Sequence, residues 1–76
     1  MKIRWQKETR SVATGYVGEI ACFEISKMQD KYELRCELPD ASPIHHGRLI
    51  THHATPREAQ RAAMLTLQHW VKRFTA

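Results

Sequence analysis

The most regular pattern of apolar and polar positions lies between residues 32 and 38. Apolar side chains face one side of an extended chain here and charged side chains face the other, with Tyr32, Leu34, Cys36 and Leu38 against Glu33, Arg35 and Glu37. Alternation with a period of two predicts a strand that has one buried and one solvent-exposed face. Less regular β-forming segments at 3–5, 12–17, 20–28 and 47–53 predict further strands.

The last third of the chain predicts one helix from about residue 56 to 74. Thr55 stands at the N-cap, Pro56 at the first helical position and Glu58 two residues later, which is a capping box with the favoured proline. We expect the Thr55 hydroxyl to accept from the Glu58 amide, and the carboxylate to accept from the Thr55 amide. At 100° per residue one face carries Ala59, Ala63, Thr66, Leu67, Trp70 and Phe74. This stripe predicts close approach to a sheet at the helix start and a wider gap at its end.

These elements predict an α+β fold, with a three- or four-stranded antiparallel sheet and one C-terminal helix packed across one face. The 76 residues correspond to a single domain, 1–76, with the sheet at about 2–53 and the helix at about 56–74. The last four of these elements follow the order β-β-β-α.

Composition and charge argue against a membrane span, a signal peptide and a disulfide framework. Twelve Lys and Arg against eight Asp and Glu give a net charge of +4, and no run approaches the ~20 apolar residues of a membrane span. The basic N-terminus lacks the apolar core of a signal peptide. Two cysteines are too few for a disulfide framework, so we expect reduced thiols and a cytoplasmic protein, with Cys36 facing inward and Cys22 outward.

The segment from Ala54 to Trp70, ATPREAQRAAMLTLQHW, is similar to the last helix of double-stranded RNA-binding domains. Thr55 takes the place of the cap, Arg57 of one basic residue, and Ala59, Ala62 and Ala63 of the small stripe. The order β-β-β-α also fits the second part of that family's fold, whereas the family's N-terminal helix has no counterpart before the first expected strand. The whole chain also resembles short phage and prophage proteins, on Trp5, Tyr32, Thr55 and these alanines. That likeness implies a small accessory factor in the host cytoplasm, for example an anti-CRISPR inhibitor of a host defence complex.

Two charged surfaces give two functional hypotheses. In the first, the protein binds and blocks a macromolecular partner such as a protein complex, using the sheet residues Glu24, Glu33, Arg35 and Glu37 or the helix around the outward-facing Leu65. An acidic sheet face could mimic a phosphate backbone. In the second, a nucleic acid binds directly to the basic helix face and its surroundings, through Arg48, Arg57, Arg61 and Lys72. Self-association through exposed sheet edges, as a homodimer, is open in both.

No pattern of residues indicates catalysis, a cofactor or a metal ion. Three isolated glycines do not form a phosphate loop, and neither CxxC nor HxxxH spacing occurs. On a strand, the neighbours His52 and His53 point to opposite faces and cannot chelate one ion. We therefore expect a non-enzymatic binding protein without a membrane partner.

Overall fold

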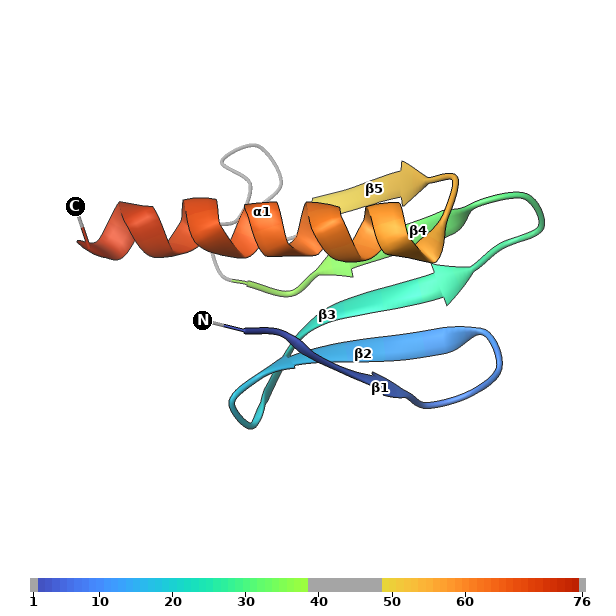
Figure 1. The fold of residues 1–76 in the computed structure, drawn as a ribbon, viewed down its shortest axis with the longest axis horizontal. Helices are drawn as coiled ribbons and strands as arrows, with labels where there is room; N and C mark the ends of the chain where they lie inside the picture. The colour runs from blue at the N-terminus through green and yellow to red at the C-terminus, as the bar shows by residue number, and fades with distance from the viewer. Residues whose placement is uncertain (1, 39–48, 76) are drawn as a thin grey trace.

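The fold is an antiparallel sheet with one helix on one of its faces (Figure 1). The computed structural model describes residues 2–38 and 49–75. The strands are β1 (Arg4–Lys7), β2 (Val12–Val17), β3 (Ile20–Lys27), β4 (Tyr32–Cys36) and β5 (Leu49–His53), followed by α1 (Pro56–Thr75). Neighbours in sequence are neighbours in the sheet, in the order β1-β2-β3-β4-β5. The α+β class and the C-terminal helix are confirmed.

The sheet differs from the expectation in its extent. Within the described residues it has five strands where the sequence predicted three or four. All five segments in which the sequence indicated strands join this one sheet, and even the short first segment pairs along its full length with β2, from Arg4 opposite Tyr16 to Lys7 opposite Ala13. Strand β4 ends at Cys36, two residues before Leu38, although the Leu38 side chain is buried.

The meander brings three connections to one end of the molecule. In an antiparallel sheet of sequential strands, alternate turns lie at the same end. The β1–β2 turn, the β3–β4 turn and the β5–α1 connection therefore lie together, at the right of Figure 1. We call residues 7–11, 27–32 and 54–57 the hairpin end.

The helix starts with the expected cap, shifted by one residue in one of its two bonds. The Glu58 amide donates to Thr55 Oγ1 at 3.1 Å. The Glu58 carboxylate accepts from the Ala54 amide at 3.2 Å, and not from that of Thr55. Reaching one residue further back still satisfies a backbone donor at the helix start.

The core lies between α1 and the strands β3, β4 and β5. Ala59 and Ala63 are fully buried, and Leu67 is buried on the same helix face. Facing them are Phe23, Ile25, Leu34 and Cys36. The small side chains let the helix start lie close to the sheet, as predicted, while the half-buried Trp70 lies nearer its end. The side chain of Phe74 lies outside the described residues.

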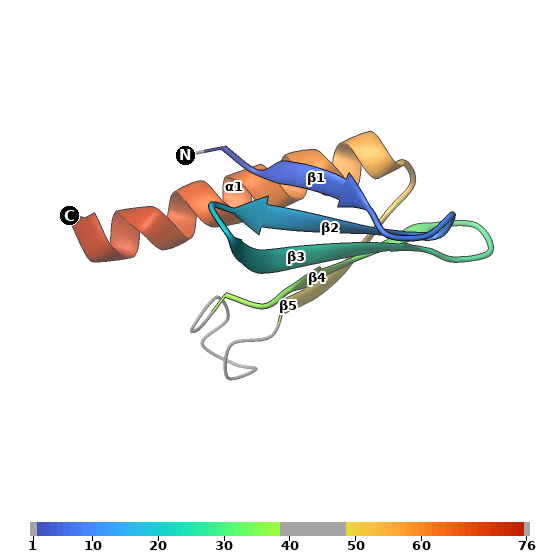
Figure 2. The same ribbon diagram turned by 90° about the horizontal axis from the view of Figure 1, so that it is seen from below.

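The helix covers only part of one face. It contacts β3, β4 and β5 and lies on one side of the sheet, and among the described residues no further element covers the opposite face (Figure 2). Among the described residues, no helix is long and apolar enough to cross a membrane.

The Trp5 ring lies on the backbone of Gly15, its partner across the β1–β2 pair. A Cβ atom at position 15 would be 2.9 Å from both Trp5 Cζ3 and Ile3 Cγ2. The ring also contacts Phe23 with centroids 6.4 Å apart. Glycine is therefore required at this position so that the first strand can pack an aromatic side chain against the core.

Next to Gly15 the sheet contains a bulge that overturns one prediction. Gly15 pairs with Phe23 but Tyr16 pairs with Ala21, so Cys22 is an extra residue on β3. An extra residue interrupts the strict alternation of a strand and re-aims its side chain. Cys22 is consequently buried beside Phe23 in the core, and the expectation that it faces outward was wrong.

Substituting Gly15→Ala should destabilise the fold by about 1–3 kcal/mol, because the added methyl group overlaps the Trp5 ring. Urea denaturation measures this loss. In the double variant with Trp5→Phe, the smaller ring leaves room, so the two losses should sum to more than the loss of the double variant. Strictly additive losses would contradict the close packing.

Substituting Thr55→Ala removes the hydroxyl that caps α1 and should cost about 1 kcal/mol. For a domain of this size that corresponds to a decrease in Tm of roughly 4–8 °C in a thermal melt. The matched control is Gln60→Ala at an exposed site inside the same helix. An equal loss in both variants would mean that the cap does not stabilise the helix.

The two cysteine thiols should react slowly with Ellman's reagent in the folded protein. Both side chains are buried, and burial raises the pKa of the Cys22 and Cys36 thiols, so that little reactive thiolate is present near pH 8. In denaturant both should react at the rate of an unstructured thiol. A fast-reacting thiol under native conditions would contradict the position assigned to it.

Candidate functional site

The sheet face turned away from α1, here called the outer face, is built from two rows of side chains across the strands. The register aligns Gln6, Thr14, Glu24, Arg35 and Ile50 in one row, and Val12, Ser26, Glu33 and His52 in the next. Side chains directly opposite each other on neighbouring strands are close enough to interact. The face therefore places acids and bases next to one another.

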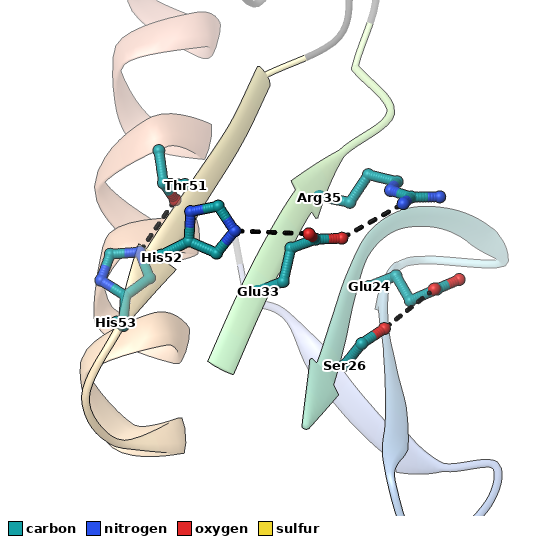
Figure 3. Close-up of polar contacts among 7 residues, drawn as sticks. All are labelled: Glu24, Ser26, Glu33, Arg35, Thr51, His52 and His53. Atoms are coloured by element: carbon teal, nitrogen blue, oxygen red, sulfur yellow. Dashed lines mark hydrogen bonds and ion pairs between the residues drawn. The ribbon is translucent and has the colours of Figure 1, made fainter. Parts of the chain in front are cut away.

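Glu33 is at the centre of this arrangement (Figure 3). Its carboxylate accepts from Arg35 Nη2 at 3.1 Å, and the second oxygen lies 3.4 Å from His52 Nε2. Only 14% of its side chain is exposed. The charge of Glu33 is thus compensated by a guanidinium on its own strand and, when His52 is protonated, by an imidazolium on the next.

The other sheet residues that were predicted to bind a partner lie around Glu33 and Arg35. Glu24 lies opposite Arg35 in the register and accepts from the Ser26 hydroxyl at 3.3 Å. Glu37 follows the end of β4 and is exposed. The structure therefore brings Glu24, Glu33 and Arg35 onto one face, where the arginine lies next to both acids.

Two more acids in the described part of the chain are engaged in internal hydrogen bonds. Glu8 accepts from the Tyr16 hydroxyl at 3.3 Å, while Arg4 lies 4.7 Å above the Tyr16 ring. Glu58 is engaged in the helix cap. These hydrogen bonds hold the two carboxylates in place, but both keep their negative charge because the donors are neutral.

The cations of the hairpin end have a different environment. Five exposed cationic side chains gather there from the two turns and the helix start, namely Lys7, Arg10, Lys27, Lys31 and Arg57. Within the described residues none of the five forms an ion pair. The acids at the same end are fewer: Glu8 and Glu58, which accept the hydrogen bonds described above, and the exposed Asp30. The hairpin end is therefore a positively charged surface.

A hollow of about 290 Å³ lies within this surface. Its lining comes from the β1–β2 turn, the strands β1 to β4 and the helix start, and consists of Lys7, Thr9, Arg10, Ser11, Val12, Ala13, Ile25, Lys27, Tyr32 and Pro56. The set combines three cations, two hydroxyl groups, a tyrosine and aliphatic side chains. This combination suits a ligand with an anionic group and an apolar body.

The basic helix face continues from the hairpin end. Arg57, Arg61 and Lys72 are exposed along α1, as the helical periodicity predicted. At 1.5 Å per residue the row spans about 22 Å. Leu65 lies exposed on the same helix, and Arg48 lies outside the described residues.

The histidines take the predicted opposite directions. His52 faces Glu33 on the outer face, whereas His53 Nε2 lies 2.8 Å from Thr51 Oγ1 (Figure 3). In the part of the chain that the structure describes, no three His, Cys, Asp or Glu side chains come together as metal ligands. His52 and His53 therefore take part in separate polar contacts on opposite faces of β5.

Sequence reasoning missed the hairpin end and its hollow because the cations there come from separate segments of the chain. Lys27 and Lys31 looked like interruptions of an acidic stretch, yet the β3–β4 turn carries them to the hairpin end, away from Glu24 and Glu33. The signal that could have revealed this is the meander itself. Once the strands are placed in sequential order, the turns at 8–11 and 28–31 must lie at the same end as residue 56.

Comparison with known proteins assigns no relative to this arrangement: no family model matches the chain, and neither a curated protein nor a solved structure is significantly similar to it.

Proposed function

We propose that the protein is a small binding module that acts without catalysis, by holding a nucleic acid through its phosphate backbone. The observation that carries this proposal is the excess of positive charge at the hairpin end. Its five exposed cations outnumber the acids Glu8, Asp30 and Glu58, and they have no ion-pair partner among the described residues. Positive charge of this kind is free to neutralise phosphates.

The binding surface extends over two adjoining regions. Arg57 belongs to both the hairpin end and the helix row, so that the two groups of cations adjoin. The Debye length of about 10 Å at 0.1 M salt keeps the acids of the sheet from cancelling these cations across the molecule. This geometry agrees with the nucleic-acid alternative derived from the sequence and adds Lys7, Arg10, Lys27 and Lys31 to its residues.

A competing proposal is that the chain is a phage-type inhibitor that blocks a protein complex, such as a CRISPR effector. Its contact would be the outer face with Glu24, Glu33 and Glu37, or the helix at the exposed Leu65. The ion pair between Glu33 and Arg35 argues against this face as a phosphate mimic, because the mimic needs uncompensated negative charge. The likeness to double-stranded RNA-binding domains belongs to the first proposal, and the likeness to phage proteins belongs to the second.

Fluorescence anisotropy with labelled duplex DNA, duplex RNA and single strands tests the proposed function. Affinity should fall steeply with salt, with a slope of about −0.9 per phosphate neutralised on B-DNA. Arg57→Gln and Arg61→Gln should each weaken binding for every sequence and reduce the magnitude of the slope by about 1. Glu24→Gln, a charge change on the outer face, is the control and should not weaken binding. If the protein binds none of these at low salt, the proposal is wrong and a protein partner becomes the explanation.

A further inference from the structure

We propose that the hollow at the hairpin end takes a single unpaired nucleotide, with its base against Tyr32 and its phosphate on Lys7, Arg10 and Lys27. The inference deepens the proposed function and rests on it. It specifies which part of a nucleic acid the hollow recognises, and it names a preference for strand ends and single strands over continuous duplex.

The size of the hollow limits what can enter. Its volume of about 290 Å³ lies just below the range of ~300–1,000 Å³ found for ligand pockets. Such a volume accommodates one nucleotide unit. It is too small for the width of a duplex, which would remain on the surface outside.

The floor of the hollow is suited to a planar apolar ring. Tyr32 is half-buried and belongs to β4, which lies between β3 and β5. The aliphatic side chain of Ile25 and the ring of Pro56 line the same space. Stacking on an aromatic side chain is available to every base, because every base has a π-face. A floor of this kind has no use in binding phosphates alone.

The rim carries the groups that an anion requires. Lys7, Arg10 and Lys27 are exposed and free of ion pairs within the described residues. Thr9 Oγ1 accepts from the amides of Ser11 and Val12, both at 3.1 Å, so its own O–H can donate outward. Pro56 at the edge of the hollow places the positive end of the α1 dipole nearby. Cations and a hydroxyl donor thus surround an apolar floor.

An unpaired nucleotide satisfies both parts at once. In a continuous duplex each base is stacked on both sides and paired, so the phosphates alone could reach the rim while the floor stayed empty. A base at an overhang or in a single strand is free to leave its neighbours at low cost. The combined site therefore discriminates between nucleic acids by the presence of an accessible base.

The test compares two labelled DNA duplexes of equal length and charge, one blunt and one with a three-nucleotide 5′-phosphorylated overhang. With the full chain at 0.1 M salt, anisotropy should show about tenfold tighter binding to the overhang, which is within the effect of stacking one base. A 2-aminopurine in the overhang should lose fluorescence on binding, because it stacks. Equal affinity for the two duplexes with unchanged 2-aminopurine fluorescence would overturn the inference and leave the proposed function standing.

Two variants assign the effect to the hollow. Tyr32→Leu should abolish the preference for the overhang while blunt-duplex binding is retained, and its folding is checked by circular dichroism. Lys27→Gln changes an exposed side chain and should reduce overhang binding more than blunt binding. Arg61→Gln, on the helix and outside the hollow, is the matched control and should weaken both duplexes equally. A preference that survives both hollow variants would contradict the assignment, and a wild-type protein that binds neither duplex would overturn the proposed function as well.

Discussion

A single helix has to cover a sheet of five strands, and this constraint determines which surfaces are left for function. Ala59 and Ala63 are fully buried, so α1 can lie close to β3, β4 and β5. One helix cannot extend over β1 and β2 at the same time. The first hairpin is held instead by the Trp5 ring on Gly15 and its contact with Phe23. The result is one open sheet face and one end where the turns meet the helix start.

Exposed charges are arranged differently on the outer face and at the hairpin end. On the outer face, register places Glu33 opposite His52 and Glu24 opposite Arg35, so acids and bases compensate one another. At the hairpin end, five exposed cations outnumber the acids Glu8, Asp30 and Glu58, and none of the five forms an ion pair within the described residues. Positive charge accumulates there for this reason. The proposed functions follow from this difference more than from the net charge of the chain.

The local parts of the structure could be predicted from the sequence and the non-local parts could not. Capping is local, so Thr55 and Glu58 identified the start of α1, with one bond displaced to Ala54. The burial of Cys22 depends on a bulge opposite Gly15, which strand alternation does not encode. The compensation of Glu33 required the β4–β5 register, and the hollow required the turns to be placed in space. The type of each residue is known from the sequence, whereas the residues that lie next to it in space become known only from the structure.

The most direct test of the account is to map the binding surface by NMR, with ¹⁵N-labelled protein titrated with a short DNA oligonucleotide. The account predicts that amide shifts gather at Lys7–Val12, Lys27–Tyr32 and Arg57–Arg61, with Glu33 and His52 on the outer face unaffected. Shifts confined to the outer face, or no shifts at low salt, would contradict the claim that the hairpin end is the functional surface.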